Sequence, residues 1–346
     1  MDENNLAADL EHVLDHTHDL WEEVRGGRIF ITGGTGFFGC WLLESFAWAN
    51  NRLNLDASIQ VLSRNPDRFR QNMPHLGNHP ALQLIRGDVR TFPFPEGSFS
   101  HIILAATDSS QKSELEEPLS IFDTILEGTR HSLEYAAHCG ARKVLFTSSG
   151  AVYGRQPAEM THIPEEYEGA PDPFSPAAAY GEAKRASESL CGIYSRQYGF
   201  EAKVARCFAF VGPFLPFNAH FAIGNFIRDG LAGGPIIVKG DGSPFRSYLY
   251  AADLAIWLWT ILFRGQSCRP YNVGSEEAVT IRTLAETVAC AFEPPRSVSI
   301  LGRSSPDKSV ERYVPSTKRA GDELELQSFI GLSDAINRTI RWASAG

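Results

Sequence analysis

The chain has 346 residues, of which 43% are hydrophobic and 21% charged, and its formal net charge is −9 at pH 7. This is the composition of an ordinary globular protein, long enough for one large domain or two lobes. The acidic balance, and the lack of any Lys/Arg run longer than two residues, argue against a nucleic-acid-binding protein. An anionic ligand is still permitted, because a few placed arginines and a helix N-terminus can bind one.

The six cysteines are scattered and form no C-x-x-C pair, which disfavours a zinc or redox motif. Because the sequence also shows no signal peptide, we expect a cytoplasmic protein. The apolar run "LAIWLWTILF" is too short to cross a bilayer, so we expect no membrane partner.

Residues 1–27 are predicted to form a helical extension, with an amphipathic helix over residues 5–25. Its apolar stripe consists of Leu6, Leu10, Val13, Leu14, Trp21 and Val24. His12, His16 and His18 lie on the same segment. A metal site is conceivable there, but a solvated polar face is the stronger interpretation, and we predict no metal.

From Arg28 the pattern changes to apolar strands that alternate with helices. Strands are expected at 28–34, 58–64, 81–89, 100–107, 143–150 and 201–212, and helices at 36–50, 118–140 and 178–199. This alternation predicts an α/β fold: a doubly wound parallel Rossmann sheet with helices on both faces. We assign residues 28–212 to this dinucleotide-binding domain.

After Gly212 the alternation gives way to proline-rich loops, short strands and short helices. Residues 213–346 are therefore predicted to form a smaller mixed α/β lobe that binds the substrate, with chain that could cross back to the sheet.

A glycine turn, Gly33, Gly36 and Gly39, follows the first strand and opens the first helix of the sheet domain. Residues without a Cβ let the backbone approach a pyrophosphate, and the helix N-terminus then offers free N–H groups to it. This context predicts a dinucleotide site. The predicted cofactor contacts also include Phe37, Phe38, Val89, Leu104, Ala105, Ala106 and Lys184.

The second strand ends in Ser63 and Arg64, where an acidic residue would bind the adenosine ribose. An arginine can instead pair with a 2′-phosphate. We therefore favour NADP(H) over NAD(H). Asp88, at the end of the third strand, is expected either to hydrogen-bond the adenine or only to cap a turn.

Candidate catalytic residues follow in chain order. Tyr180 and Lys184, in "YGEAK", are four residues apart and share one helix face. A nearby ammonium favours the phenolate, so such a tyrosine can exchange a proton with an alcohol or ketone oxygen. Ser149, in "TSSGAVYG" at a strand end, could hydrogen-bond the same oxygen.

These motifs resemble those of extended short-chain dehydrogenases/reductases, in the nucleotide-sugar epimerase/dehydratase family. The resemblance covers nearly everything from Arg28 onward, including "ITGGTGFFG", "RGDV", "TSSGAVYG", "YGEAK" and "GDGSPFRSYLYAADL". It implies Ser149 and Tyr180 on the sugar oxygen and Lys184 on the cofactor ribose. It also implies Asn225 and Arg246 on the diphosphate of a nucleoside-diphosphate sugar, and a homodimer built from the two long helices.

The sequence departs from the family at a few positions. Gly150 and Ala151 stand where the family's dehydratases and decarboxylases carry an acid, which disfavours both reactions unless Glu165, Glu166 or another acid moves in. Ala209 replaces the family's usual asparagine in the sixth strand, and Ile125 replaces another.

Without an extra acid, the reaction that these residues can support is oxidation or reduction at one carbon of the sugar. The first hypothesis is a 4-keto sugar reductase that consumes NADPH, favoured by Ser63 and Arg64. The second is a nucleotide-sugar 4-epimerase with a retained NAD, and the third is a cofactor-binding protein without catalysis.

Overall fold

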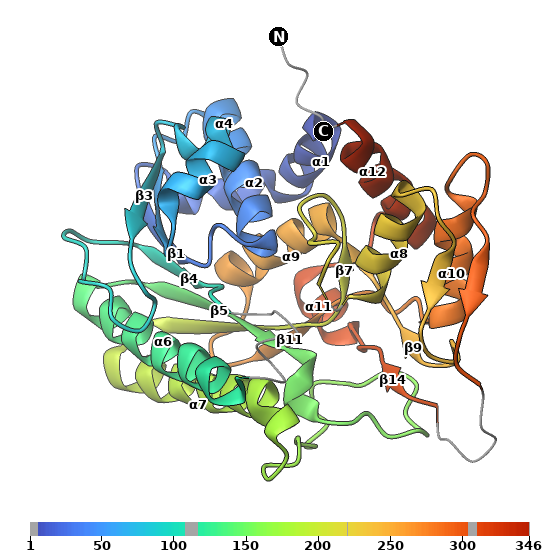
Figure 1. Ribbon diagram of the computed structural model, residues 1–346. Coiled ribbons are helices and arrows are strands. Elements are labelled where there is room, and N and C mark those ends of the chain that lie inside the picture. The colour runs from blue at the N-terminus through green and yellow to red at the C-terminus, as the bar shows by residue number, and fades with distance from the viewer. Residues whose placement is uncertain (1–5, 108–116, 220, 304–309, 346) are drawn as a thin grey trace.

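The computed structural model describes residues 6–107, 117–219, 221–303 and 310–345. Its large sheet contains β1 (Arg28–Thr32), β2 (Ser58–Ser63), β3 (Leu82–Arg86), β4 (His101–Leu104), β5 (Lys143–Ser149), β6 (Glu201–Cys207) and β11 (Pro270–Val273). All seven strands are parallel, in the order β11-β6-β5-β4-β1-β2-β3 (Figure 1). The predicted doubly wound parallel sheet is confirmed.

Strand β1 shows why these segments form a buried parallel sheet. Its residues Ile29, Phe30 and Ile31 follow one another without a polar residue, and all are 0% exposed. Successive side chains of a strand point to opposite faces, so an unbroken apolar run requires cover on both sides.

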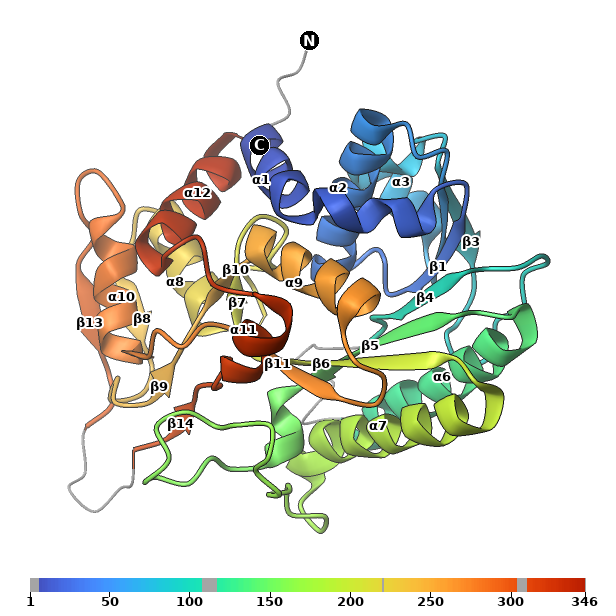
Figure 2. The same ribbon diagram turned by 180° about the vertical axis from the view of Figure 1, so that it is seen from behind.

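Two layers of helices provide this cover (Figures 1 and 2). Helices α6 (Pro118–Cys139) and α7 (Ala179–Tyr198) pack on one face of the sheet. Helices α2 (Phe37–Leu53) and α9 (Ala251–Arg264) pack on the other. The short helices α3 (Pro66–Asn72) and α4 (Pro74–Gly77) connect β2 to β3.

The N-terminal extension contains two elements where the sequence predicted one helix. Helix α1 (Ala7–Thr17) is followed by a 3-10 helix, η1 (His18–Val24). Every residue of the predicted apolar stripe is buried. The tighter 3-10 turn brings Trp21 against Trp259 of α9, with 4.8 Å between the ring centroids. This contact between distant segments is not encoded in local periodicity, so the sequence pattern missed the change of helix type.

The extension also joins the two ends of the described chain through buried carboxylates. Asp253 in α9 accepts hydrogen bonds from the backbone N–H groups of Phe329 and Ile330, at 2.9 and 3.0 Å, and lies 3.1 Å from His12 Nε2. Asp9 accepts from Tyr250 and Arg338, each at 2.5 Å. These bonds attach α1 to α9 and to the C-terminal helix.

Helix α9 contains the apolar run "LAIWLWTILF", and every residue from Ala251 to Phe263 is buried. It lies between the large sheet and the helices α1 and α2 (Figure 2). Within the described ranges, no helix combines the length and the apolar character needed to cross a membrane.

The second half of the chain builds the smaller lobe from short elements. Its helices are α8 (Ala222–Leu231), α10 (Ile281–Cys290), α11 (Lys318–Leu324) and α12 (Leu332–Ala345). Its strands are β7 (Phe210–Val211), β8 (Ile236–Val238), β9 (Phe245–Arg246), β10 (Leu249–Tyr250), β12 (Val279–Thr280), β13 (Val298–Ile300) and β14 (Arg312–Tyr313). Between β10 and β12 the chain returns to the large sheet as α9 and β11. Residues beyond 212 therefore complete the sheet that carries the glycine turn.

The three N-terminal histidines each have a different hydrogen-bond partner. His12 pairs with Asp253, His16 Nδ1 contacts the backbone oxygen of His12, and His18 contacts Asp19. Among the described residues, no group of three or more His, Cys, Asp or Glu is arranged to hold a metal ion.

Candidate active site

A cleft of about 880 Å³ lies at the carboxyl edge of the large sheet, where β1 is flanked by β2 and β4. The strand order reverses at this point: β2 and β3 follow on one side of β1, and β4, β5 and β6 on the other. Such switch points are where open α/β sheets bind ligands. The cleft is lined by most of the residues predicted from the sequence: Gly33, Gly36, Phe37, Phe38, Ser63, Arg64, Asp88, Val89, Ala105, Ala106, Ser149, Tyr180, Lys184 and Arg246.

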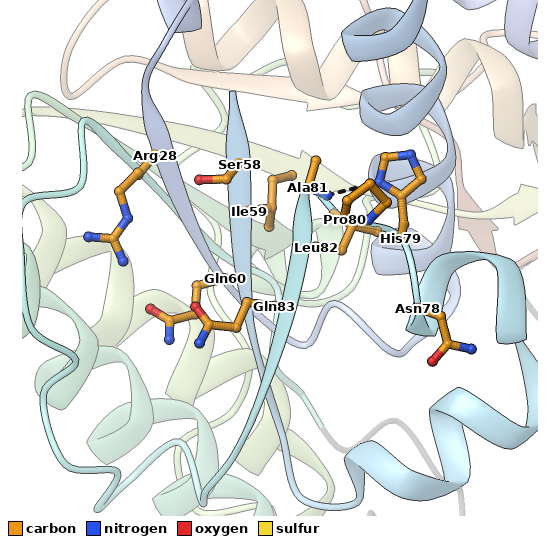
Figure 3. A pocket seen from close by; sticks show the side chains of 10 residues that line it. All are labelled: Arg28, Ser58, Ile59, Gln60, Asn78, His79, Pro80, Ala81, Leu82 and Gln83. Atoms are coloured by element: carbon orange, nitrogen blue, oxygen red, sulfur yellow. Dashed lines mark hydrogen bonds between the residues drawn. The ribbon is translucent and has the colours of Figure 1, made fainter. Parts of the chain in front are cut away.

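A smaller hollow of about 410 Å³ lies near the opposite end of the strands, next to Ser58 and Leu82 (Figure 3). Figure 3 shows Gln60 and Gln83 side by side on neighbouring strands of its wall. None of the predicted catalytic or cofactor residues lines this hollow. The larger cleft is therefore the candidate active site.

The glycine turn is shaped by close backbone contacts. Gly33 has a φ of +72°, and a Cβ there would come within 2.3 Å of the Ala105 carbonyl oxygen. A Cβ on Gly39 would come within 2.3 Å of the Gly34 backbone. Gly36 is the N-cap of α2, with no side-chain cap, and a Cβ there would meet nothing closer than 3.5 Å. This cradle and the unpaired N–H groups that start a helix fit a dinucleotide pyrophosphate.

The far end of the cleft carries a cluster of charges suited to an adenosine group. Asp88 accepts from the Arg90 guanidinium through two bonds of 2.9 Å, and Arg64 lines the same wall. The hydrogen bond from Arg90 lowers the pKa of Asp88 to about 2. The backbone N–H of Asn65 donates to the Ser63 hydroxyl at 3.2 Å. Arg90 was not predicted, although it stands two residues after Asp88.

Strand β5 ends at Ser149, which places the serine hydroxyl in the cleft. The Ser149 Oγ accepts a hydrogen bond of 3.1 Å from the backbone N–H of Ala151 and so caps a short 3-10 helix, η2 (Gly150–Tyr153). Ser149 therefore caps η2 and lies at the cleft at the same time.

Tyr180 and Lys184 lie on the first turns of α7, after the 3-10 helix η3 (Pro176–Ala178). Lys184 is 1% exposed, and its Nζ donates to the Thr147 carbonyl oxygen at 2.8 Å. The Nζ lies 5.7 Å from the centre of the Tyr180 ring. Burial lowers the pKa of Lys184 to about 8. The helix thus brings the predicted tyrosine and ammonium together at the wall that carries Ser149.

The acids that could have compensated for Gly150 and Ala151 are bound elsewhere. Glu165 accepts from the Asn272 backbone N–H at 2.8 Å, and burial raises its pKa. Glu166 pairs with Arg319 at 2.6 Å. Neither residue lines the cleft, and Asp88 is the only carboxylate among its described lining residues.

The opposite wall comes from the smaller lobe. Arg246 lines the cleft, donating to Glu311 and to the Phe245 carbonyl oxygen at 2.8 Å each. Asn225 does not line it: its side chain donates to the Ala219 carbonyl oxygen and accepts from Arg228.

Two predicted cofactor contacts also lie behind the cleft wall. Leu104 is buried in the core, and Gly39 packs on the backbone of Gly34.

Several aromatic side chains in this wall were not predicted. Phe208, Phe210, Phe221, Tyr248 and Tyr313 all line the cleft. Tyr313 lies in a two-residue strand and belongs to no motif, so no local pattern singled it out. Phe208 stands one residue before Ala209, in the segment where the departure from the family pattern was visible.

Comparisons with known proteins agree with this geometry. A model of the NAD dependent epimerase/dehydratase family matches residues 29–274. UDP-glucuronic acid decarboxylase 1 from Danio rerio is 30% identical over 318 residues, which cover 92% of this chain and 72% of that protein. UDP-glucuronic acid decarboxylase 6 from Arabidopsis thaliana is 29% identical over 311 residues, 89% of this chain and 86% of that protein.

Solved structures share the fold at lower identity. The UDP-N-acetylglucosamine 4-epimerase of Methanobrevibacter ruminantium M1 has a TM-score of 0.78 at 21% identity, covering 92% of this chain and 98% of that one. The dTDP-glucose 4,6-dehydratase DesIV of Streptomyces venezuelae, solved with NAD bound, has a TM-score of 0.77 at 23% identity, covering 92% and 97%. Together with the glycine cradle and the Ser149, Tyr180 and Lys184 set, the family match shows that the chain is an enzyme of the NAD-dependent epimerase/dehydratase family, within the extended short-chain dehydrogenases/reductases.

Proposed function

We propose that the protein performs redox chemistry at one ring carbon of a nucleoside-diphosphate sugar, as a 4-keto sugar reductase or, alternatively, as a 4-epimerase. The observation that carries the proposal is the composition of the cleft. Ser149, Tyr180 and Lys184 share it with the glycine turn, and no carboxylate stands beside them among the described lining residues.

Each residue has a defined task in this proposal. Tyr180 donates its proton to the ketone oxygen of the sugar, and the Ser149 hydroxyl hydrogen-bonds the same oxygen. Lys184 keeps a positive charge beside Tyr180 and binds the cofactor ribose. Arg246 provides the forked donors that a diphosphate accepts. A bound nicotinamide cofactor supplies the hydride, or accepts it in the reverse direction.

Decarboxylation of a nucleotide-linked sugar acid is the second candidate, and the comparisons support it better than they support the 4-keto reductase, because both relatives described above are named UDP-glucuronic acid decarboxylases. Oxidation at C4 turns a sugar acid into a β-keto acid, which can lose carbon dioxide without a carboxylate side chain. The lack of an acid at Gly150 and Ala151 therefore argues more strongly against dehydration than against decarboxylation. Family membership speaks against the third hypothesis, a protein without catalysis.

We also propose NADP(H) as the preferred cofactor. Arg64 and Arg90 both line the adenosine end, while the single carboxylate there, Asp88, is already paired with Arg90. A 2′-phosphate would meet two guanidinium groups. Replacing Arg64 by Ala should weaken NADPH binding by roughly 10- to 100-fold, the cost of one charge-assisted hydrogen bond, and change NADH binding little. Equal losses for both cofactors would contradict the preference.

The test of the reaction uses three substrates in parallel. Purified protein is incubated with a 4-keto-6-deoxy nucleotide sugar and NADPH, with UDP-glucose and NAD, and with UDP-glucuronic acid and NAD. Mass spectrometry and nicotinamide absorbance then distinguish a reduced sugar, an epimer and a product that has lost carbon dioxide. Replacing Tyr180 by Phe should lower turnover about 100- to 10,000-fold while cofactor binding is retained. Loss of carbon dioxide from the sugar acid, with no turnover of the other two substrates, would establish the decarboxylase instead.

A further inference from the structure

A second tyrosine reaches the catalytic serine from the other side of the cleft. Tyr313 is in β14, in the smaller lobe, and its hydroxyl lies 3.5 Å from the Ser149 Oγ, across 164 residues of sequence. This distance is long for a hydrogen bond between hydroxyl groups. Catalytic hydrogen bonds commonly shorten once substrate is bound.

The space for Tyr313 exists because residue 150 is a glycine. A Cβ on Gly150 would come within 2.7 Å of the Tyr313 hydroxyl and within 2.7 Å of the Phe208 ring. Phe208 in turn packs against Tyr313, with 4.7 Å between ring centroids. Any side chain at position 150 would therefore force Tyr313, Phe208 or both to shift.

In the three-stranded sheet β12-β9-β14, Tyr313 lies directly beside Arg246, because β14 pairs with β9 at these two residues. Arg246 lines the wall that faces the glycine turn. Tyr313 therefore stands between the serine on the cofactor side and the arginine on the substrate side.

A count of donors and acceptors at Ser149 shows what this tyrosine can do. A serine hydroxyl has one proton to donate and two lone pairs that accept. One lone pair is occupied by the Ala151 N–H at 3.1 Å. If the Tyr313 O–H donates to the second lone pair, the Ser149 O–H can only point away from both donors.

We propose that Tyr313 is a positioning residue for Ser149, donating its hydroxyl proton so that the serine proton is aimed at the sugar oxygen. The role rests on the proposed function, since it presumes that Ser149 hydrogen-bonds a substrate oxygen.

Tyr313 can act as this donor over a wide pH range. Burial raises its pKa to about 12, so the hydroxyl stays protonated at neutral and mildly alkaline pH. The titratable groups that act on it are Cys207 from β6, which raises its pKa, and Arg246 from β9, which lowers it.

A double-mutant cycle tests whether Tyr313 acts through Ser149. Tyr313→Phe keeps the ring against Phe208 and removes only the hydroxyl. We expect kcat to fall about tenfold, with KM nearly unchanged, because one hydrogen bond made to the serine is lost. In a Ser149→Ala background the same change should cost nothing, because the group that it positions is gone. Equal losses in both backgrounds, or no loss in either, would overturn the proposal.

Crystal structures of the wild-type protein and of Tyr313→Phe decide the question even if the proposed reaction is wrong. We expect one Ser149 rotamer within hydrogen-bond distance of Tyr313 in the wild type, and more than one rotamer in the variant. An unchanged single rotamer in the variant would refute the positioning role, whereas absence of turnover in the wild type would refute only the proposed function. Tyr135→Phe is the matched control: it removes the hydroxyl of another buried tyrosine, which donates to the Pro95 carbonyl oxygen at 3.2 Å, outside the cleft.

Discussion

At the residue scale, the most unusual group in the cleft is a lysine that is buried with a single hydrogen bond. Lys184 gains the Thr147 carbonyl oxygen as a partner but no carboxylate within hydrogen-bond distance. Burial lowers its pKa from the ordinary value of 10.5 to about 8. Between these two values the unfolded chain binds more protons than the folded one, so the stability contribution of this group rises with pH in that window. At neutral pH the buried positive charge lowers the free energy of unfolding.

Replacing Lys184 should therefore change activity and stability in opposite directions. Lys184→Met should lower turnover about 100-fold or more, because the charge beside Tyr180 is lost. The same change should raise the free energy of unfolding by about 1–3 kcal/mol at pH 7, because a desolvated charge is removed. In the wild type, ketone reduction should decline as pH rises through about 8. Kinetics, chemical denaturation and a pH profile check these outcomes; a variant that is both inactive and less stable would contradict the account.

The residues of the proposed catalytic set could be named from the sequence because they lie within short motifs. Tyr180 and Lys184 are one helical turn apart, and Ser149 ends a strand that the apolar pattern identifies. Tyr313 could not be found in this way, since its role depends on a contact across 164 residues. Asn225 shows that a family motif can also mislead. The resemblance implied that it binds the substrate, but its side chain hydrogen-bonds within its own segment and does not line the cleft.

At the element scale, the glycine turn joins β1 to α2 at backbone-contact distance. Gly39→Ala would place a methyl group 2.3 Å from the Gly34 backbone, so α2 must shift away from the turn. We expect a loss of about 2–4 kcal/mol in unfolding free energy and weaker cofactor binding. The control is Gly321→Ala in α11, where the nearest atom is 3.6 Å away and a gain of about 0.5–1 kcal/mol is expected. Calorimetry and cofactor titration measure both; equal effects would refute the packing argument.

Helices α6 and α7 present apolar side chains to solvent as well as to the sheet. Ile193 is 56% exposed and Leu119 is 71% exposed. We propose that these helices form the homodimer interface expected from the sequence. Ile193→Asp should convert a dimer into a monomer in light scattering, because a charge would replace an apolar contact at the interface. A wild-type protein that is already monomeric would refute the proposal.

The secondary structure was largely predictable because each buried strand carries its own apolar run and each long helix its own periodicity. The 3-10 segment η1 was not, since packing of Trp21 against Trp259 accompanies the change of helix type.

At the scale of the whole molecule, Asp253 connects three separate parts of the chain. It accepts from two backbone N–H groups at Phe329 and Ile330 and contacts His12. Asp253→Ala would leave these donors buried without a partner, and we expect a loss of about 2–4 kcal/mol in unfolding free energy. Asp253→Asn, which keeps an acceptor oxygen, should lose less. Urea denaturation of the two variants checks the order, and equal losses would contradict it.

The parallel sheet follows from the alternation of elements before residue 213. The membership of β11 in that sheet could not be read from the sequence, because "YNVGS" is as short and apolar as the strands of the smaller lobe.

The return of α9 and β11 to the large sheet has a consequence for protein engineering. A chimaera that exchanges the smaller lobe with that of a relative cannot be cut once, near residue 212, because the recipient sheet would lose its outermost strand and its central covering helix. The transplant has to be made in two pieces, leaving residues 251–273 with the host. Under the proposed function, selectivity for the sugar could then be transferred between enzymes while residues 251–273 keep the large sheet complete.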